Sequence, residues 1–228
     1  TEIIQLVVGM VGAAPGADIL TELEAIFDSG VSIADMAVAI ADNPAFNGDS
    51  GLYPAYLPNA VFATNWVTDL IGDEVSAANL TLAIDAVTAL LNAGDSRGAV
   101  MYAAITAIAA VATDDADFGA ASAALANKTA VAEYYSVTVA QSSTDLDDLF
   151  AVLDGVDSTD ASVTAGNAAV DQAIIDATPF VLADALADLD AAQDAIEAFL
   201  VTADGDDDPL TSTDAGTVLG AVTPAIAA

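Results

Sequence analysis

Cysteine and histidine are both missing from this chain of 228 residues. A disulfide framework, a thiol nucleophile and a zinc site built on cysteine or histidine are therefore excluded. A serine nucleophile would lack the imidazole base that completes a Ser-His-Asp triad. The sequence also contains neither a phosphate-binding P-loop nor a GxGxxG turn. We therefore predict that the protein is not an enzyme.

Positive charge is almost absent as well, since Arg97 and Lys128 face 35 acidic residues and the formal net charge is −33. Binding to nucleic acid requires lysine and arginine to displace counterions from phosphates, so nucleic acid is excluded as a partner. The longest uncharged apolar run, residues 98–113, has 16 residues. It is shorter than the roughly 20 residues that a membrane-spanning helix needs, so we predict no membrane insertion.

Apolar residues are nevertheless abundant, at 55% of the chain. Disordered acidic chains are poor in such residues, so we expect a folded protein with a strongly negative surface. Repulsion among the carboxylates destabilises a compact state in dilute salt. High ionic strength or bound divalent cations would relieve it. We expect Arg97 and Lys128 each to meet several carboxylates and to be candidates for subunit contact.

Apolar residues recur at spacings of three and four, which predicts an all-α bundle of about eight helices. One alternating segment, Tyr135 to Val139, reads as a short strand. We divide the chain into a repeat-containing helical domain at 1–140, further helices packed on it at 141–203, and an acidic loop with an extended arm at 204–228. The clearest apolar faces are Ile19, Leu20, Leu23, Ile26 and Phe27; Leu80, Ile84, Val87, Leu90 and Leu91; and, after a Thr178-Pro179 start, residues from Leu182 to Leu200.

An internal repeat is visible in the first half of the chain. Residues 27–32, Phe-Asp-Ser-Gly-Val-Ser, correspond to residues 91–96, Leu-Asn-Ala-Gly-Asp-Ser, 64 positions later. Each copy predicts a helix, a left-handed glycine turn and a second helix capped by serine. Helical hairpins bury little surface alone, so we expect the two units to pack together.

The pattern of apolar helix, Gly-x-Ser and Ala-rich helix resembles the helical N-terminal domain of alphaproteobacterial S-layer proteins and related type I-secreted surface proteins. The phrase Asn127-Lys128-Thr129-Ala130-Val131-Ala132-Glu133-Tyr134-Tyr135 is similar to another recurring phrase of that domain. The resemblance covers roughly Leu6 to Val139 and implies an extracellular role at the bacterial cell surface. The chain departs from the fuller family architecture because it has no Gly-Gly-x-Gly-x-Asp nonapeptides.

Two groups of residues are candidate sites. Calcium prefers oxygen ligands, which are dense at Asp204, Asp206, Asp207 and Asp208 and are also offered by Asn47 and Asp49. Both groups also read as ordinary solvated turns. Tyr53, Tyr56 and Trp66 lie in the most aromatic region and are candidates for contact with a sugar or a neighbouring subunit. The simpler reading of that region is a packed plug between the two repeats.

The leading hypothesis is a secreted structural protein of the bacterial surface that self-assembles into an S-layer lattice or a filament, assisted by calcium or salt. The alternative is a calcium-dependent surface anchor or adhesin that binds cell-surface polysaccharide. A third reading is an ordinary helical protein of a halophile, acidic for solubility.

Overall fold

The computed structural model describes residues 1–177, 189, 191–192 and 195–196. The predicted all-α class is confirmed, because the described residues form ten α-helices and no strand. The packing divides after Ile174 into two units, which are considered separately. The helices are α1 (Glu2–Val11), α2 (Ala17–Asp28), α3 (Ile33–Ala41), α4 (Pro44–Asn47), α5 (Asn59–Ile71), α6 (Ala77–Ala93), α7 (Arg97–Ala109), α8 (Gly119–Glu133), α9 (Leu146–Ala151) and α10 (Asp160–Ala177).

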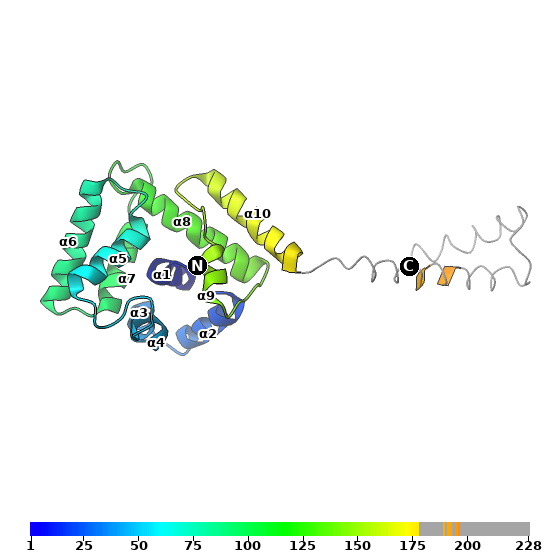
Figure 1. Ribbon diagram of the computed structural model, residues 1–228, viewed down its shortest axis with the longest axis horizontal. Coiled ribbons are helices and arrows are strands. Elements are labelled where there is room, and N and C mark those ends of the chain that lie inside the picture. The colour runs from blue at the N-terminus through cyan, green and yellow to red at the C-terminus, as the bar shows by residue number, and fades with distance from the viewer. Residues whose placement is uncertain (178–188, 190, 193–194, 197–228) are drawn as a thin grey trace, which may run out of the picture. The chain divides into compact units, whose positions relative to one another are not determined.

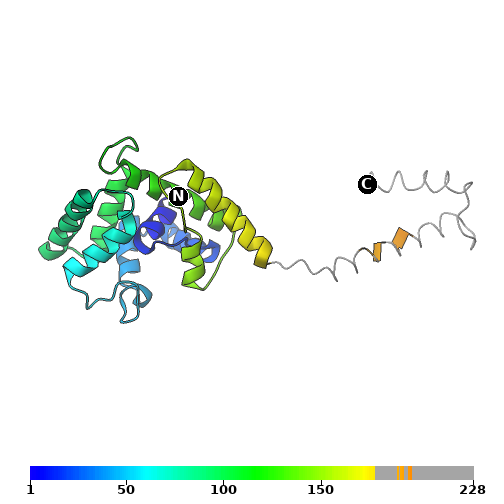
Figure 2. The ribbon, with the colours of Figure 1, turned by 45° about the horizontal axis from the view of Figure 1, so that its top comes forward.

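Helix α1 forms the centre of the first unit, with the other helices arranged around it (Figures 1 and 2). Seven of its ten residues are buried, and Ile4, Leu6 and Met10 are almost completely enclosed. It packs against α3, α7 and α8. A helix that is apolar on every side is stable only when it is surrounded, so the sequence of α1 requires this central position.

The repeated segments form two helical hairpins, α2–α3 and α6–α7. The glycines at their turns, Gly30 and Gly94, have φ values of 99° and 105°. Only glycine adopts this left-handed conformation without strain. The next helix of each hairpin begins at a serine, and the side chains of Ser32 and Ser96 each accept a hydrogen bond from the backbone amide three residues later. The turn and cap chemistry expected from the sequence is present in both copies.

The second helices of the two hairpins, α3 and α7, pack closely against each other at Gly98. A Cβ atom at this position would lie 2.5 Å from the Cα of Val38 and 2.6 Å from the carbonyl oxygen of Ala37. Both neighbours are backbone atoms, which cannot rotate away. Gly98 therefore sets the distance between the two repeats.

The chain after α8 differs from the sequence prediction. Residues Tyr134–Thr138 form a π-helical turn that continues α8, so the strand predicted from Tyr135 to Val139 is wrong. The amide of Val139 donates to the carbonyl of Tyr134 at 2.9 Å. The alternation of side chains was misleading because an isolated strand has no neighbour to satisfy its backbone groups, whereas a helical turn satisfies them locally.

The segment from 141 to 149 pairs with the backbone that joins α1 to α2. The amide of Ala17 donates to the carbonyl of Gln141 at 2.8 Å, and the amide of Ala14 donates to the carbonyl of Leu149 at 3.1 Å. These bonds hold α9 beside the end of α1 and the start of α2. The predicted acidic loop and arm at 204–228, and most of the long apolar face from Leu182 to Leu200, lie outside the described residues.

Candidate functional site

The candidate calcium ligands Asn47 and Asp49 lie at the end of α4 and in the loop that follows it, where Asp49 is exposed. The carbonyl of Asn47 accepts a hydrogen bond from the amide of Ala55 at 2.7 Å. Within the described residues, no three acidic side chains gather closely enough to hold a metal ion. The other candidates, Asp204, Asp206, Asp207 and Asp208, lie outside those residues, so calcium binding there stays a prediction.

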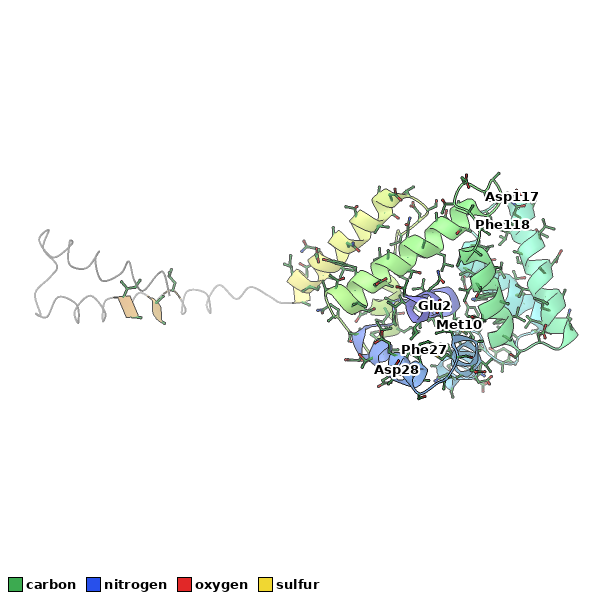
Figure 3. All side chains as sticks on the ribbon, turned by 180° about the vertical axis from the view of Figure 1, so that it is seen from behind. Glu2, Met10, Phe27, Asp28, Asp117 and Phe118 are labelled. Atoms are coloured by element: carbon green, nitrogen blue, oxygen red, sulfur yellow. The ribbon has the colours of Figure 1, made fainter. Side chains whose placement is uncertain are left out.

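Acidic side chains in two turns accept hydrogen bonds from backbone amides at the start of the helix that follows. The carboxylate of Asp115 accepts hydrogen bonds from the amides of Asp117 and Phe118, both at 2.9 Å, just before α8. Figure 3 shows Asp117 and Phe118 at this turn. These backbone donors stabilise the ionised form and lower the pKa of Asp115. Asp145 caps α9 in a similar way, with the amide of Asp147 as donor.

Arg97, at the start of α7, holds the loop that joins α4 to α5. Its guanidinium donates hydrogen bonds to the carbonyl oxygens of Tyr53 (3.0 Å), Pro54 (3.0 Å), Ala55 (3.4 Å) and Leu57 (2.7 Å). We refer to this arrangement as the Arg97 clamp.

The carbon at the centre of the Arg97 guanidinium also lies 4.3 Å from the centre of the Phe62 ring, a cation–π contact. Desolvation lowers the pKa of Arg97, although an arginine stays protonated at any ordinary pH. The expectation that this residue meets several carboxylates is wrong. Its guanidinium is instead directed at the carbonyl oxygens of the loop that joins α4 to α5.

Lys128, the other cation, is half-buried on α8. With Trp66 and Asp69 it lines a small cavity of about 20 Å³, which has room for about one water molecule. The side chain of Lys128 forms no hydrogen bond or ion pair with the described part of the chain. The two cations therefore have different surroundings, and only Arg97 is locked in place by polar contacts.

The aromatic region forms a continuous row in the core. Ring centres are 5.3 Å apart for Phe46 and Tyr53, 5.6 Å for Tyr53 and Phe62, and 6.3 Å for Phe62 and Trp66. Trp66 is 1% exposed and Tyr53 is 6% exposed, whereas Tyr56 is 69% exposed. Tyr53 and Trp66 therefore offer no surface to a sugar or a subunit. Of the three aromatic candidates, Tyr56 alone is exposed.

Polar atoms within the aromatic row are paired. The indole nitrogen of Trp66 donates to the carbonyl of Gly9 on α1 at 3.1 Å. The hydroxyl of Tyr53 donates to the carboxylate of Asp69 at 2.6 Å. Burial, and then the hydrogen bond and charge of Asp69, raise the pKa of Tyr53 far above that of a free tyrosine. The region is therefore part of the hydrophobic core.

An apolar depression lies where α1 ends, between α2, α3, α4 and α9. We call it the apolar groove. It has a volume of about 300 Å³, and its lining contains no charged residue. Ile19 and Leu146 stand at its edge, 42% and 38% exposed. Leu23, Ile40, Phe46 and Leu149 form much of its wall.

Sequence reasoning did not find the apolar groove. It assigned Ile19 and Leu23 to the apolar face of a helix, but only Leu20 on α2 is buried. The one feature of the sequence that could have indicated the groove is that α2 has more apolar residues than one buried face requires. The groove itself requires α9, which arrives from more than 100 residues further along the chain.

The fold and surface define the protein as a strongly acidic all-α domain. In the described residues, none of the helices is both long and apolar enough to cross a bilayer. Comparison with protein-family models, curated proteins and solved structures gives no match for this chain.

Proposed function

We propose that this chain is an extracellular structural domain of the bacterial cell surface that self-assembles into a lattice or filament. The observation that carries the proposal is the apolar groove, an open surface without a charged lining residue on a chain with a formal charge of −33. Exposed apolar depressions of this kind mark places where another surface binds. The resemblance of Leu6 to Val139 to helical S-layer domains supports the extracellular setting.

Cations would control the assembly through the surrounding carboxylates. Asp18 on α2, Asp42 after α3 and Asp147 on α9 are exposed on the elements that bound the apolar groove. When two copies approach, such carboxylates repel each other, because their charges come within a few ångströms. Salt shortens the range of this repulsion to about 10 Å at 0.1 M and about 3 Å at 1 M. Calcium would act more strongly at equal concentration by bridging carboxylates from two copies.

The test is negative-stain electron microscopy of the purified chain with millimolar calcium, against a chelated sample. We expect ordered sheets or fibres with calcium and discrete particles with chelator. The variant Ile19→Asp, which places a carboxylate at the edge of the apolar groove, should not assemble. Its matched control is Thr21→Asp, which adds the same charge to α2 outside the groove lining and should assemble as the original chain does.

Assembly that ignores chelator, salt and Ile19→Asp alike would contradict this proposal. The adhesin alternative retains Tyr56 as its exposed aromatic side chain. Discrete particles in every condition, together with polysaccharide binding that is lost in Tyr56→Ala, would favour the adhesin instead.

A further inference from the structure

The segment 141–154, which carries α9, is joined to the rest of the first unit at two residues with a positive φ. Ala140 before it has a φ of 50°, and Gly155 after it has a φ of 73°. In the described part of the chain, Ala140 is the one residue other than glycine with a positive φ. A residue with a Cβ adopts this left-handed conformation only at a cost in free energy. We call the segment between these two residues the strap.

The chain is anchored on both sides of the strap. Ser136, in the π-helical turn before it, is 3% exposed, and Val156 after it is 5% exposed. The strap itself is more exposed, because Leu149 and Leu153 are its only buried residues. Helix α1, in comparison, buries seven of its ten residues. A segment with few buried side chains opens at a lower cost in free energy than the core to which it is attached.

Three hydrogen bonds attach the strap to the chain between the end of α1 and the start of α2, beside which Figure 1 shows α9. The amides of Ala14 and Ala17 donate to carbonyl oxygens of the strap at 3.1 and 2.8 Å. The amide of Asp18 donates to the hydroxyl oxygen of Ser142 at 2.9 Å. All three donors lie outside the strap, so each amide loses its acceptor when the strap moves away.

We propose that the strap opens as one unit about Ala140 and Gly155 while the rest of the first unit stays folded. Opening frees Ala140 from its left-handed conformation, which favours the open form. It also breaks the three hydrogen bonds and exposes Leu149, which favours the closed form. This inference concerns the single chain, so it stands whether or not copies of the chain assemble.

Opening removes part of the wall of the apolar groove. Leu146 and Leu149 line the groove from the strap, whereas Ile19 and Leu23 line it from α2. The groove is therefore complete only while the strap is closed. A molecule that contacts both sides of the groove binds the closed form alone, and it shifts the strap toward that form. The strap thus couples the shape of the groove to the backbone conformation at its two ends.

Amide hydrogen exchange of the full-length chain, followed residue by residue by NMR, measures the opening. The amides of Ala14 and Ala17 report on the strap, and those of Val8 and Met10, whose side chains are buried in α1, report on the core. After correction for intrinsic rates, we expect the strap pair to exchange about tenfold faster than the core pair, or more. Equal corrected rates would overturn the inference, because the strap would then open only when the whole unit unfolds.

Two substitutions at the ends of the strap should shift its opening in opposite directions. Ala140→Gly removes the strain from the closed form, so exchange at Ala14 and Ala17 should slow by about three- to tenfold. Gly155→Ala adds strain to the closed form and should speed exchange there by a similar factor. A Cβ at Gly155 would meet no atom within 4 Å, so the change acts through backbone conformation alone.

Gly30→Ala is the matched control, because Gly30 has a φ of 99° and a Cβ there would also meet no atom within 4 Å. This variant should speed exchange of the core amides and leave Ala14 and Ala17 unchanged. If Gly30→Ala and Gly155→Ala speed exchange at Ala14 and Ala17 equally, the ends of the strap have no special role and the inference is wrong. Unchanged exchange at these two amides in Ala140→Gly would overturn it as well.

Discussion

Replacing Arg97 by methionine removes the guanidinium of the Arg97 clamp while keeping much of its apolar stem. Three of its hydrogen bonds to carbonyl oxygens are 3.0 Å or shorter, and the fourth is 3.4 Å. A bond made by a charged donor contributes about 1.5–3 kcal/mol when it is well buried, but these carbonyls lie in a partly exposed loop and can partly rehydrate.

Counting about 1 kcal/mol for each short bond and about 0.5–1 kcal/mol for the contact with Phe62, we expect Arg97→Met to lose roughly 3–4 kcal/mol of unfolding free energy. At about 2–4 °C per kcal/mol for a domain of this size, the melting temperature should fall by roughly 6–16 °C. Arg97→Lys should recover only part of the loss, because an ammonium group donates from one point and cannot reach all four carbonyl oxygens.

The matched control is Lys128→Met, which changes the formal charge of the chain by the same amount. Because the side chain of Lys128 makes no hydrogen bond or ion pair with the described residues, this variant should lose less than about 1 kcal/mol. Urea unfolding followed by circular dichroism should be measured for both variants at 0.1 M and 1 M sodium chloride. Salt should leave the difference in unfolding free energy between the two variants unchanged, because the partners of Arg97 are carbonyl groups, which carry no net charge.

Equal losses for Arg97→Met and Lys128→Met would refute this reasoning, since the contribution of Arg97 would then be its net charge alone. A loss for Arg97→Met that disappears at 1 M salt would also refute it. That result would indicate pairing with carboxylates, which high salt screens.

Two further predictions concern the core. Gly98→Ala should lose about 1–3 kcal/mol of unfolding free energy despite the better helix propensity of alanine, because the new Cβ would meet the backbone of Val38 at 2.5 Å. The control Gly166→Ala should lose less in the same thermal unfolding assay, because its Cβ would meet valine methyl groups at 3.0 Å or more. The advantage of the original chain over Tyr53→Phe should be complete below about pH 10 and should shrink by up to about 1.4 kcal/mol per pH unit above it, because burial and Asp69 raise the pKa of Tyr53 in the folded state. A stability difference that stays constant from pH 9 to 12 would contradict that assignment.

Local features of this protein were predictable from the sequence. The helices follow from apolar spacing, and the turns at Gly30 and Gly94 with the caps at Ser32 and Ser96 follow from neighbouring residues. Such features depend on contacts within a few positions along the chain. The segment at 135–139 was misjudged because its alternation carried no information about whether a partner strand existed.

The candidate site depended on distant contacts instead. From the sequence we expected the abundant carboxylates to be the partners of Arg97, but in the folded chain its guanidinium contacts a loop 40 or more residues earlier. Trp66 and Tyr53 were candidates for contact with a sugar or a subunit, but both lie in the core. Tyr56, which lies between them in the sequence, is exposed. Residue type alone cannot decide such cases, because an aromatic ring suits a core and an interface equally well.

By itself, the sequence determined a folded, all-helical, strongly acidic domain without thiol or imidazole chemistry. These properties follow from composition and from spacing along one chain. The tertiary structure decided which apolar residues remained outside the core. Ile19 on α2 lies next to the buried Leu20 in one apolar face of that helix, and it is 42% exposed because no other helix of the described unit covers it. The apolar groove is a product of packing, since it exists only where helices from distant parts of the chain meet.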